Sequence, residues 1–150
     1  MSEASVVAIY TAPEKHRALV ARDEVVAVAG QGLEGDRYFN ADGWDEPKRE
    51  ITLIELEAIE AANRDYDIGL TPQDMRRQIV TKGVALNHLV GREFTLGDVR
   101  CLGVKLNEPC NHLRKLADKP LIKPMIHRGG LRAQILDGGT IRVGDPIRSS

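Results

Sequence analysis

From residue 83 onward, the sequence is a series of short β-like runs separated by glycines, and this pattern limits the fold more than any other feature. Nine of the fourteen glycines lie in this part of the chain. Glycines at this density mark tight turns, where the backbone can take positive φ angles. Short strands joined by tight turns favour a closed or nearly closed barrel, because closure leaves no strand edge exposed. We therefore expect a mainly β (α+β) fold with two or three helices.

Apolar patterning predicts where these elements lie. The clearest hairpin signal is the pair of alternating runs on either side of Asp137-Gly138-Gly139. Helices are predicted from residue 55 onward and over residues 110–117, and Thr71-Pro72 has the residue types of a helix start. The expected strands, which share β-branched or alternating apolar residues, cover 5–11, 24–29, 51–54, 76–81, 92–96, 99–106, 131–136 and 140–143.

Length and composition exclude several classes of protein. The chain of 150 residues has the size of a single domain, and 42% hydrophobic residues are enough for an ordinary core. Twenty-one basic and twenty-two acidic side chains leave a net charge of −1, so we expect neither nucleic-acid nor membrane binding. The sequence has no apolar run long enough for a membrane span, and Met1-Ser2-Glu3 does not resemble the basic start of a signal peptide. We expect a cytoplasmic protein with reduced thiols.

The two cysteines differ in their sequence surroundings. Cys110 ends the segment Asn107-Glu-Pro-Cys110, which follows a predicted strand and opens a predicted helix. Unsatisfied N–H groups at a helix start favour a thiolate, which can serve as a nucleophile, a sulfur carrier or a metal ligand. The alternative is that Cys110 is a buried, inert thiol, since free cysteines are among the most buried residues. Cys101 lies in the middle of a predicted strand and is expected to be structural.

Basic residues near Cys110 suggest an anionic ligand. Residues 105–132 carry seven Lys or Arg against two acidic residues. Arg128 precedes Gly129-Gly130, and a glycine pair allows backbone N–H groups to approach a phosphate closely. Arg37, in a glycine-containing turn, could equally pair with a carboxylate or bind an anion. The pair Cys110-x-His112 has no second pair at zinc-like spacing, so we expect no zinc.

Taken together, a set of short motifs resembles the MOSC domain family, which is named for the C-terminal domain of molybdenum cofactor sulfurase. The likeness is to the short, stand-alone bacterial type. It extends from about residue 30 to 147 and covers most of a single domain of residues 1–150. The motifs are Gly35-Asp-Arg37, Arg77-Gln-Ile-Val80 with Gly83, Leu89-Val-Gly91 with Phe94-x-Leu-Gly97, Glu108-Pro-Cys110-x-x-Leu113, Arg128-Gly-Gly130, and Gly139-x-Ile141-x-x-Gly144-Asp145.

The resemblance implies a fold and a cofactor. The fold would be the MOSC-type β-barrel, which is similar to the pyruvate kinase β-barrel-like fold. The cofactor would be the molybdenum cofactor, a pterin dithiolene (molybdopterin) with a phosphate group. Cys110 matches the family cysteine, which either ligates molybdenum or carries a persulfide. The candidate cofactor contacts are Arg37, Arg77, Arg128, Gly129 and Gly130.

Three functions follow from the resemblance. One is binding or storage of the cofactor without turnover, and the other two involve chemistry at Cys110. In the first of these two, the protein reduces small N-hydroxylated compounds at molybdenum, with Cys110 as catalytic residue and metal ligand. In the second, Cys110 accepts a persulfide from a pyridoxal-phosphate-dependent cysteine desulfurase and carries sulfur to a metal–sulfur cluster or to the cofactor. Larger relatives carry additional modules that this sequence does not show. The electrons or the sulfur would therefore come from a separate electron-transfer protein or from the desulfurase.

Overall fold

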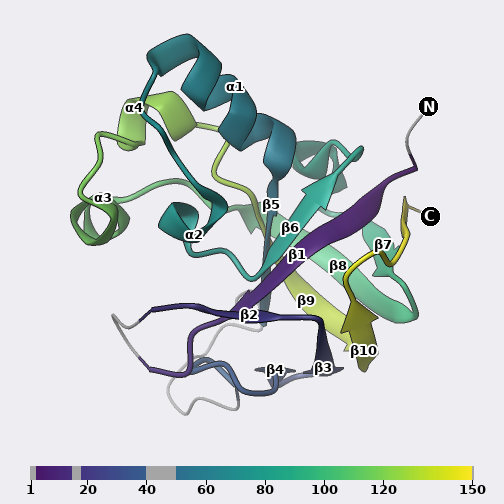
Figure 1. The fold of residues 1–150 in the computed structure, drawn as a ribbon. Coiled ribbons are helices and arrows are strands. Elements are labelled where there is room, and N and C mark those ends of the chain that lie inside the picture. The colour runs from purple at the N-terminus through teal and green to yellow at the C-terminus, as the bar shows by residue number, and fades with distance from the viewer. Residues whose placement is uncertain (1–2, 15–17, 40–49, 150) are drawn as a thin grey trace.

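Strands predominate in the computed structural model, which describes residues 3–14, 18–39 and 50–149 (Figure 1). The predicted mainly β class is confirmed. The strands are β1 (Ser5–Thr11), β2 (Val20–Arg22), β3 (Glu24–Val28), β4 (Gly32–Leu33), β5 (Ile51–Glu55), β6 (Ile79–Lys82), β7 (Glu93–Leu96), β8 (Val99–Leu106), β9 (Leu131–Asp137), β10 (Gly139–Arg142) and β11 (Ile147–Ser149). The helices in these described ranges are α1 (Leu56–Tyr66), α2 (Pro72–Met75), the 3₁₀ helix η2 (Leu86–Leu89), α3 (Asn111–Ala117) and α4 (Ile122–Met125), so there are more helices than the two or three expected.

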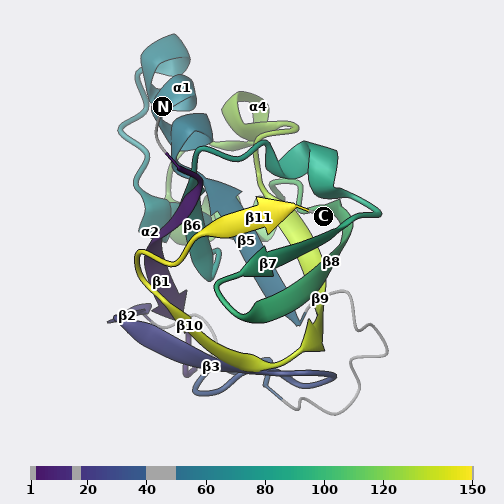
Figure 2. The ribbon, with the colours of Figure 1, turned by 90° about the vertical axis from the view of Figure 1, so that its right-hand side faces the viewer.

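The strands form two sheets. The larger sheet has the order β11-β7-β8-β9-β5-β6-β1-β2, and the smaller has the order β10-β3-β4. Among the named strands of the described residues, only β5 and β6 pair in parallel, as expected for two strands connected through helices α1 and α2. Backbone hydrogen bonds of 2.9 Å from Val6 to Asp145 and from Ile147 to Ala4 bring the start of β1 against the chain leading into β11. The larger sheet is therefore strongly curled, with β11 and β2 as its edges in the described part of the chain (Figure 2).

The hairpin predicted over residues 131–143 is wrong, although both of its strands exist. Strand β9 pairs with β8 and β5 in the larger sheet, whereas β10 pairs with β3 in the smaller sheet. Gly138 lies at the corner between them, where a Cβ atom would be 2.5 Å from the Ala27 carbonyl oxygen. The glycines here permit a change of sheet rather than a tight hairpin turn. Alternation of apolar and polar residues identifies a strand but not its partner.

The connection from α2 to β6 also differs from the expectation. The predicted helix start is confirmed, because Thr71 and Asp74 form a reciprocal capping box. The strand predicted over 76–81 begins only at Ile79. Arg76 instead ends helix α2 in the left-handed conformation, with φ of 57°. This turn directs the chain so that Arg76 and Arg77 precede the strand rather than belong to it.

Two apolar clusters stabilise the fold. The first fills the space enclosed by the strands and includes Cys101, which is fully buried. The second lies between the helices and the sheet and includes Leu113 of α3 and Met125 of α4. The four α-helices gather along one side of the curled sheet (Figure 1). None of the helices in the described ranges has the length and apolar character that a membrane span requires.

Candidate functional site

A cavity of about 310 Å³ opens between the helices and the sheet. This volume lies at the small end of the range for ligand sites, which is about 300–1,000 Å³. Its walls come from β1, β5, β9, the loop after β4, the α2–β6 connection, and the segment from the end of β8 into α3. The lining residues are Tyr10, Ala12, Leu19, Asp36, Arg37, Tyr38, Thr52, Arg76, Arg77, Gln78, Asn107, Glu108, Cys110, His112, Leu113, Leu116 and Arg132.

Cys110 lines this cavity and is exposed, so it is not the buried thiol of the alternative interpretation. It has an extended backbone at the N-cap of α3, and its carbonyl accepts the first helical hydrogen bond, from the N–H of Arg114 at 3.0 Å. Cys101 has the opposite surroundings, and its structural role is confirmed. Burial, with a smaller effect from Glu50, raises the pKa of the Cys101 thiol to about 12. Of the two cysteines, only Cys110 is placed for chemistry.

The segment leading to Cys110 is fixed at Asn107, which is buried. The Asn107 N–H donates to the carbonyl of Gly130 at 2.8 Å. The Asn107 carbonyl accepts from Arg77 Nη2 at 2.6 Å, and its side-chain Oδ1 accepts from Arg132 Nε at 3.0 Å. Three contacts from distant parts of the chain therefore hold the residue three positions before Cys110.

Arg77 forms part of the cavity wall but is itself only 8% exposed. Its Nε donates to the Gly129 carbonyl at 2.7 Å and its Nη1 to the Met75 carbonyl at 3.0 Å, in addition to the bond to Asn107. Burial lowers the pKa of Arg77 to about 10, with the charge of Cys110 acting in the opposite direction. Arg77 is therefore charged at neutral pH. It supplies a fixed positive charge beside Cys110, and each of its three nitrogens is already bound to the protein.

Arg37 stands in a different environment. The preceding Asp36 accepts backbone N–H bonds from Ala12 at 2.8 Å and from Tyr38 at 3.2 Å, which fastens the turn. Arg37 donates to the Tyr38 hydroxyl and lies 4.2 Å from the centroid of that ring. Its Nε is buried and has no hydrogen-bond partner among the described residues. Of the two sequence interpretations, anion binding fits this placement better than pairing with a carboxylate.

The sequence analysis missed two further arginines of the cavity, Arg76 and Arg132. Burial, followed by the positive charge of Arg37, lowers the pKa of Arg76. Arg132 lies on β9 directly opposite Thr52 of β5 and Lys105 of β8. Arg76 directly precedes the quoted motif Arg77-Gln-Ile-Val80, so its place next to Arg77 was the available signal. Cationic side chains this close together repel one another, and a bound anion would relieve the repulsion.

Arg128, Gly129 and Gly130 are not among the described residues that line the cavity. Arg128 Nη2 forms an ion pair with Asp65 of α1 at 3.1 Å. A Cβ atom on Gly129 would lie 2.3 Å from the Asn107 carbonyl oxygen, and one on Gly130 would lie 1.9 Å from that of Leu53. The two glycines are needed because other backbone segments approach them closely. A direct cofactor contact by these three residues stays a prediction.

The described residues contain no group of three or more His, Cys, Asp or Glu side chains that could hold a metal ion. The Cys110 thiol is a soft donor in the cavity wall, and it lines the cavity together with Glu108 and the arginines. His112 of the Cys110-x-His112 pair does line the cavity. Asp36 is occupied by backbone N–H groups, as described above. This donor set suits a metal that arrives with its own ligands and an anionic group.

Comparison with known proteins places the chain in a family. The family model of the MOSC domain matches residues 40–148. The chain belongs to the MOSC domain family. No curated protein matches this MOSC domain chain.

Solved structures show the same fold at low sequence identity. The YuaD protein from Bacillus subtilis superposes with a TM-score of 0.83 at 18% identity, over 99% of this chain and 96% of YuaD. YiiM from Escherichia coli has a TM-score of 0.73 at 18% identity, over 100% of this chain and 70% of YiiM. YiiM from Geobacillus stearothermophilus has a TM-score of 0.70 at 17% identity, over 98% of this chain and 75% of that one. At these identities the comparison establishes the fold alone.

Proposed function

We propose that this MOSC domain protein binds the molybdenum cofactor in the cavity, with Cys110 as a ligand of the metal, and reduces small N-hydroxylated compounds there. The observation that carries the proposal is that an exposed thiol shares one cavity with four arginines. Arginine binds phosphate well because its planar guanidinium offers two parallel N–H donors. A thiolate is a soft metal ligand, and the cofactor supplies the phosphate.

The residues present fit this cofactor. The buried Arg37 Nε without a partner among the described residues indicates a site that accepts an anion. Arg37 and Arg76 would hold the phosphate, and the fixed positive charge of Arg77 would face the bound group beside Cys110. The bound group would supply two-electron reduction of an N–O bond at molybdenum.

In this function the residues of the chain bind the cofactor and orient the substrate. The reaction consumes two electrons and two protons, breaks the N–O bond, and yields an amine and water. The electrons would come from a separate electron-transfer protein. Because Cys110 is exposed at the cavity, a small substrate could reach it from solvent, and the apolar side chains of Leu113 and Leu116 would bound its path.

Metal analysis tests the proposal most directly. Protein produced in cells that make the molybdenum cofactor should contain molybdenum, and Cys110→Ser should lose it. Cys101→Ala is the matched control, because it removes the buried thiol and should leave the molybdenum content unchanged. An unchanged metal content in Cys110→Ser would exclude direct ligation. Reduction of a hydroxylaminopurine with a supplied electron donor would then separate catalysis from storage of the cofactor.

The same placement of Cys110 supports a second candidate, sulfur carriage. An exposed thiolate can attack the persulfide of a cysteine desulfurase, so that the outer sulfur moves to Cys110 and the desulfurase thiolate leaves. Incubation with a desulfurase and cysteine, followed by intact-mass analysis, should add one sulfur atom to wild-type protein and to Cys101→Ala but not to Cys110→Ser. A chain that contains molybdenum and gains no sulfur would exclude this candidate.

A further inference from the structure

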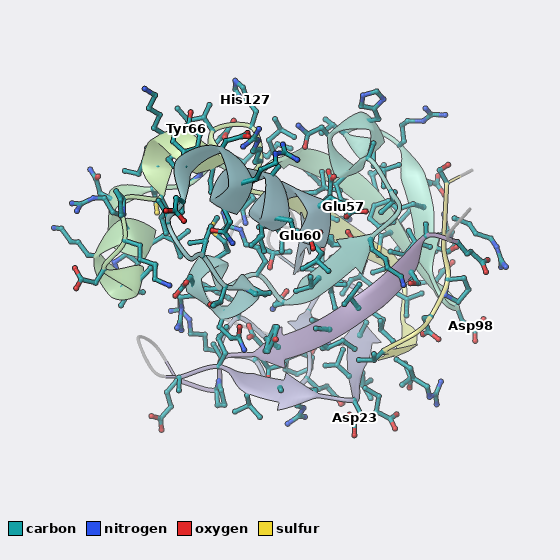
Figure 3. All side chains as sticks on the ribbon, turned by 45° about the horizontal axis from the view of Figure 1, so that its top comes forward. Asp23, Glu57, Glu60, Tyr66, Asp98 and His127 are labelled. Carbon is teal, nitrogen blue, oxygen red and sulfur yellow. The ribbon has the colours of Figure 1, made fainter. Side chains whose placement is uncertain are left out.

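The Glu108 side chain, two residues before Cys110, is held at both of its oxygens by one residue. Glu108 Oε1 accepts the backbone N–H of His127 at 2.7 Å, and Glu108 Oε2 lies 2.7 Å from His127 Nδ1. Glu108 lines the cavity, whereas the His127 side chain is 73% exposed and lies at the periphery of the molecule, beside α4 (Figure 3). The contact thus connects the segment that carries Cys110 with the segment that follows α4.

His127 has an unusual backbone for this contact. Its φ is +61°, in the left-handed region that residues other than glycine seldom adopt. This conformation presents the N–H and the imidazole to the same carboxylate, while the His127 carbonyl accepts from Asn87 Nδ2 of η2 at 2.8 Å. Strained conformations persist where the surroundings over-determine them, and they cluster at functional sites. An exposed contact between a carboxylate and an imidazole contributes at most about 0–1 kcal/mol, so global stability does not account for the arrangement.

We propose that Glu108 is a positioning residue, held by His127, that fixes Cys110 at the cavity for metal ligation. This role rests on the proposed function, in which Cys110 ligates the metal. The contact between Glu108 and His127 is observed independently of that function. Asn107 is held by Arg77, Arg132 and Gly130, as described above. Glu108 is held by His127, and only Pro109, whose ring restricts φ, separates it from Cys110. Fixing Glu108 therefore restricts where the thiol can lie.

Three variants and one control test this role. Glu108→Ala removes both contacts. Glu108→Gln keeps them, because its carbonyl oxygen can accept the His127 N–H and its amide can donate to Nδ1. His127→Gly suits the positive φ and keeps the backbone contact but loses the imidazole. Glu93→Ala is the matched control, because Glu93 forms a comparably exposed pair with Arg100 on the sheet.

Two measurements separate the inference from the proposed function. The first is hydrogen exchange of the peptide covering residues 110–117 in metal-free full-length protein. Exchange should become faster in Glu108→Ala and in His127→Gly, but not in Glu108→Gln or Glu93→Ala. The second is molybdenum affinity of the loaded protein, which should fall about tenfold or more in Glu108→Ala and be restored in Glu108→Gln, as is typical for residues that orient a metal ligand.

Each result decides one proposal. Unchanged hydrogen exchange and unchanged molybdenum affinity in Glu108→Ala would overturn the inference. A Glu108→Gln variant as impaired as Glu108→Ala would also overturn it, because the charge of Glu108 rather than its contacts with His127 would then matter. If Glu108→Ala does not fold, His127→Gly takes its place, since it should be at least as stable as the wild type. Wild-type protein without molybdenum would overturn the proposed function, while the exchange rates would still decide whether Glu108 fixes the segment.

Discussion

Replacing Arg77 by glutamine tests whether this arginine holds the site together or contacts the ligand. The guanidinium joins three buried carbonyls, those of Met75, Asn107 and Gly129, which lie 2, 30 and 52 residues away in the sequence. Hydrogen bonds from a charged group each contribute about 1.5–3 kcal/mol. The substitution also removes the cost of burying the charge, which the lowered pKa of Arg77 reflects. We therefore expect a net destabilisation of about 3 kcal/mol rather than the full sum.

Urea unfolding measures this loss, and thermal unfolding provides a second measurement. In a domain of this size, a loss of about 3 kcal/mol corresponds to a decrease of about 6–12 °C in Tm. Arg128→Gln is the matched control, because its ion pair with Asp65 is partly exposed and should contribute less than about 1 kcal/mol. If Arg77→Gln lost no more stability than Arg128→Gln, the proposed clamp would be wrong. If it kept its stability but lost molybdenum, Arg77 would be the direct cofactor contact that the sequence suggests.

Three further predictions concern glycine, thiol and carboxyl groups. Gly130→Ala should cost about 3 kcal/mol or more, because its Cβ would overlap a carbonyl of β5, whereas Gly91→Ala, which has open space, should cost about 1 kcal/mol in the same urea titration. A thiol reagent should modify Cys110 alone in the folded protein and Cys101 only after unfolding in guanidinium; two reactive thiols in the folded protein would contradict the burial of Cys101. Burial raises the pKa of Glu50 above its usual value of 4.5. The stability that the Glu50 carboxyl contributes is therefore fully present below pH 4.5, and it is lost as the pH rises through the pKa of Glu50 in the folded protein. Glu50→Gln should therefore gain stability relative to wild type between pH 4.5 and 8, and a constant difference in unfolding free energy over that range would refute this.

Strand positions could be predicted from the sequence because they depend on local patterns. The strands over 5–11 and 99–106 have the predicted bounds, since alternating or β-branched runs end there at turn residues. The partners of β9 and β10 could not be predicted in this way. Their pairing depends on contacts with strands far away in the sequence, and the glycines between them permit a corner as readily as a hairpin turn. Arg76 was placed in a strand because its left-handed conformation has no marker in the local sequence.

The sequence predicted the cysteine of the candidate site but not the roles of its arginines, again because local patterns do not reveal contacts between distant segments. The sequence distinguished Cys110 from Cys101, because one follows a strand and opens a helix while the other lies within a strand. It could not distinguish the arginines, since each is a cation in a glycine-containing motif. Their roles depend on whether their N–H donors are already bound. This is set by folding, which brings carbonyls from three segments to Arg77.

The hydrogen-bond partners of each guanidinium therefore indicate the function of an arginine better than the motif that contains it. Arg77 donates to carbonyls of the protein and Arg128 to the carboxylate of Asp65, so these N–H donors already have partners. Arg37 keeps a buried nitrogen that has no hydrogen-bond partner among the described residues. Burial, and then the positive charge of Arg37, lowers the pKa of Arg76. A cavity that holds two repelling cations next to an exposed thiol gains stability when an anion binds between them. Anion binding should accordingly stabilise this protein against unfolding more at low ionic strength than at high, and Arg37→Gln should reduce that gain.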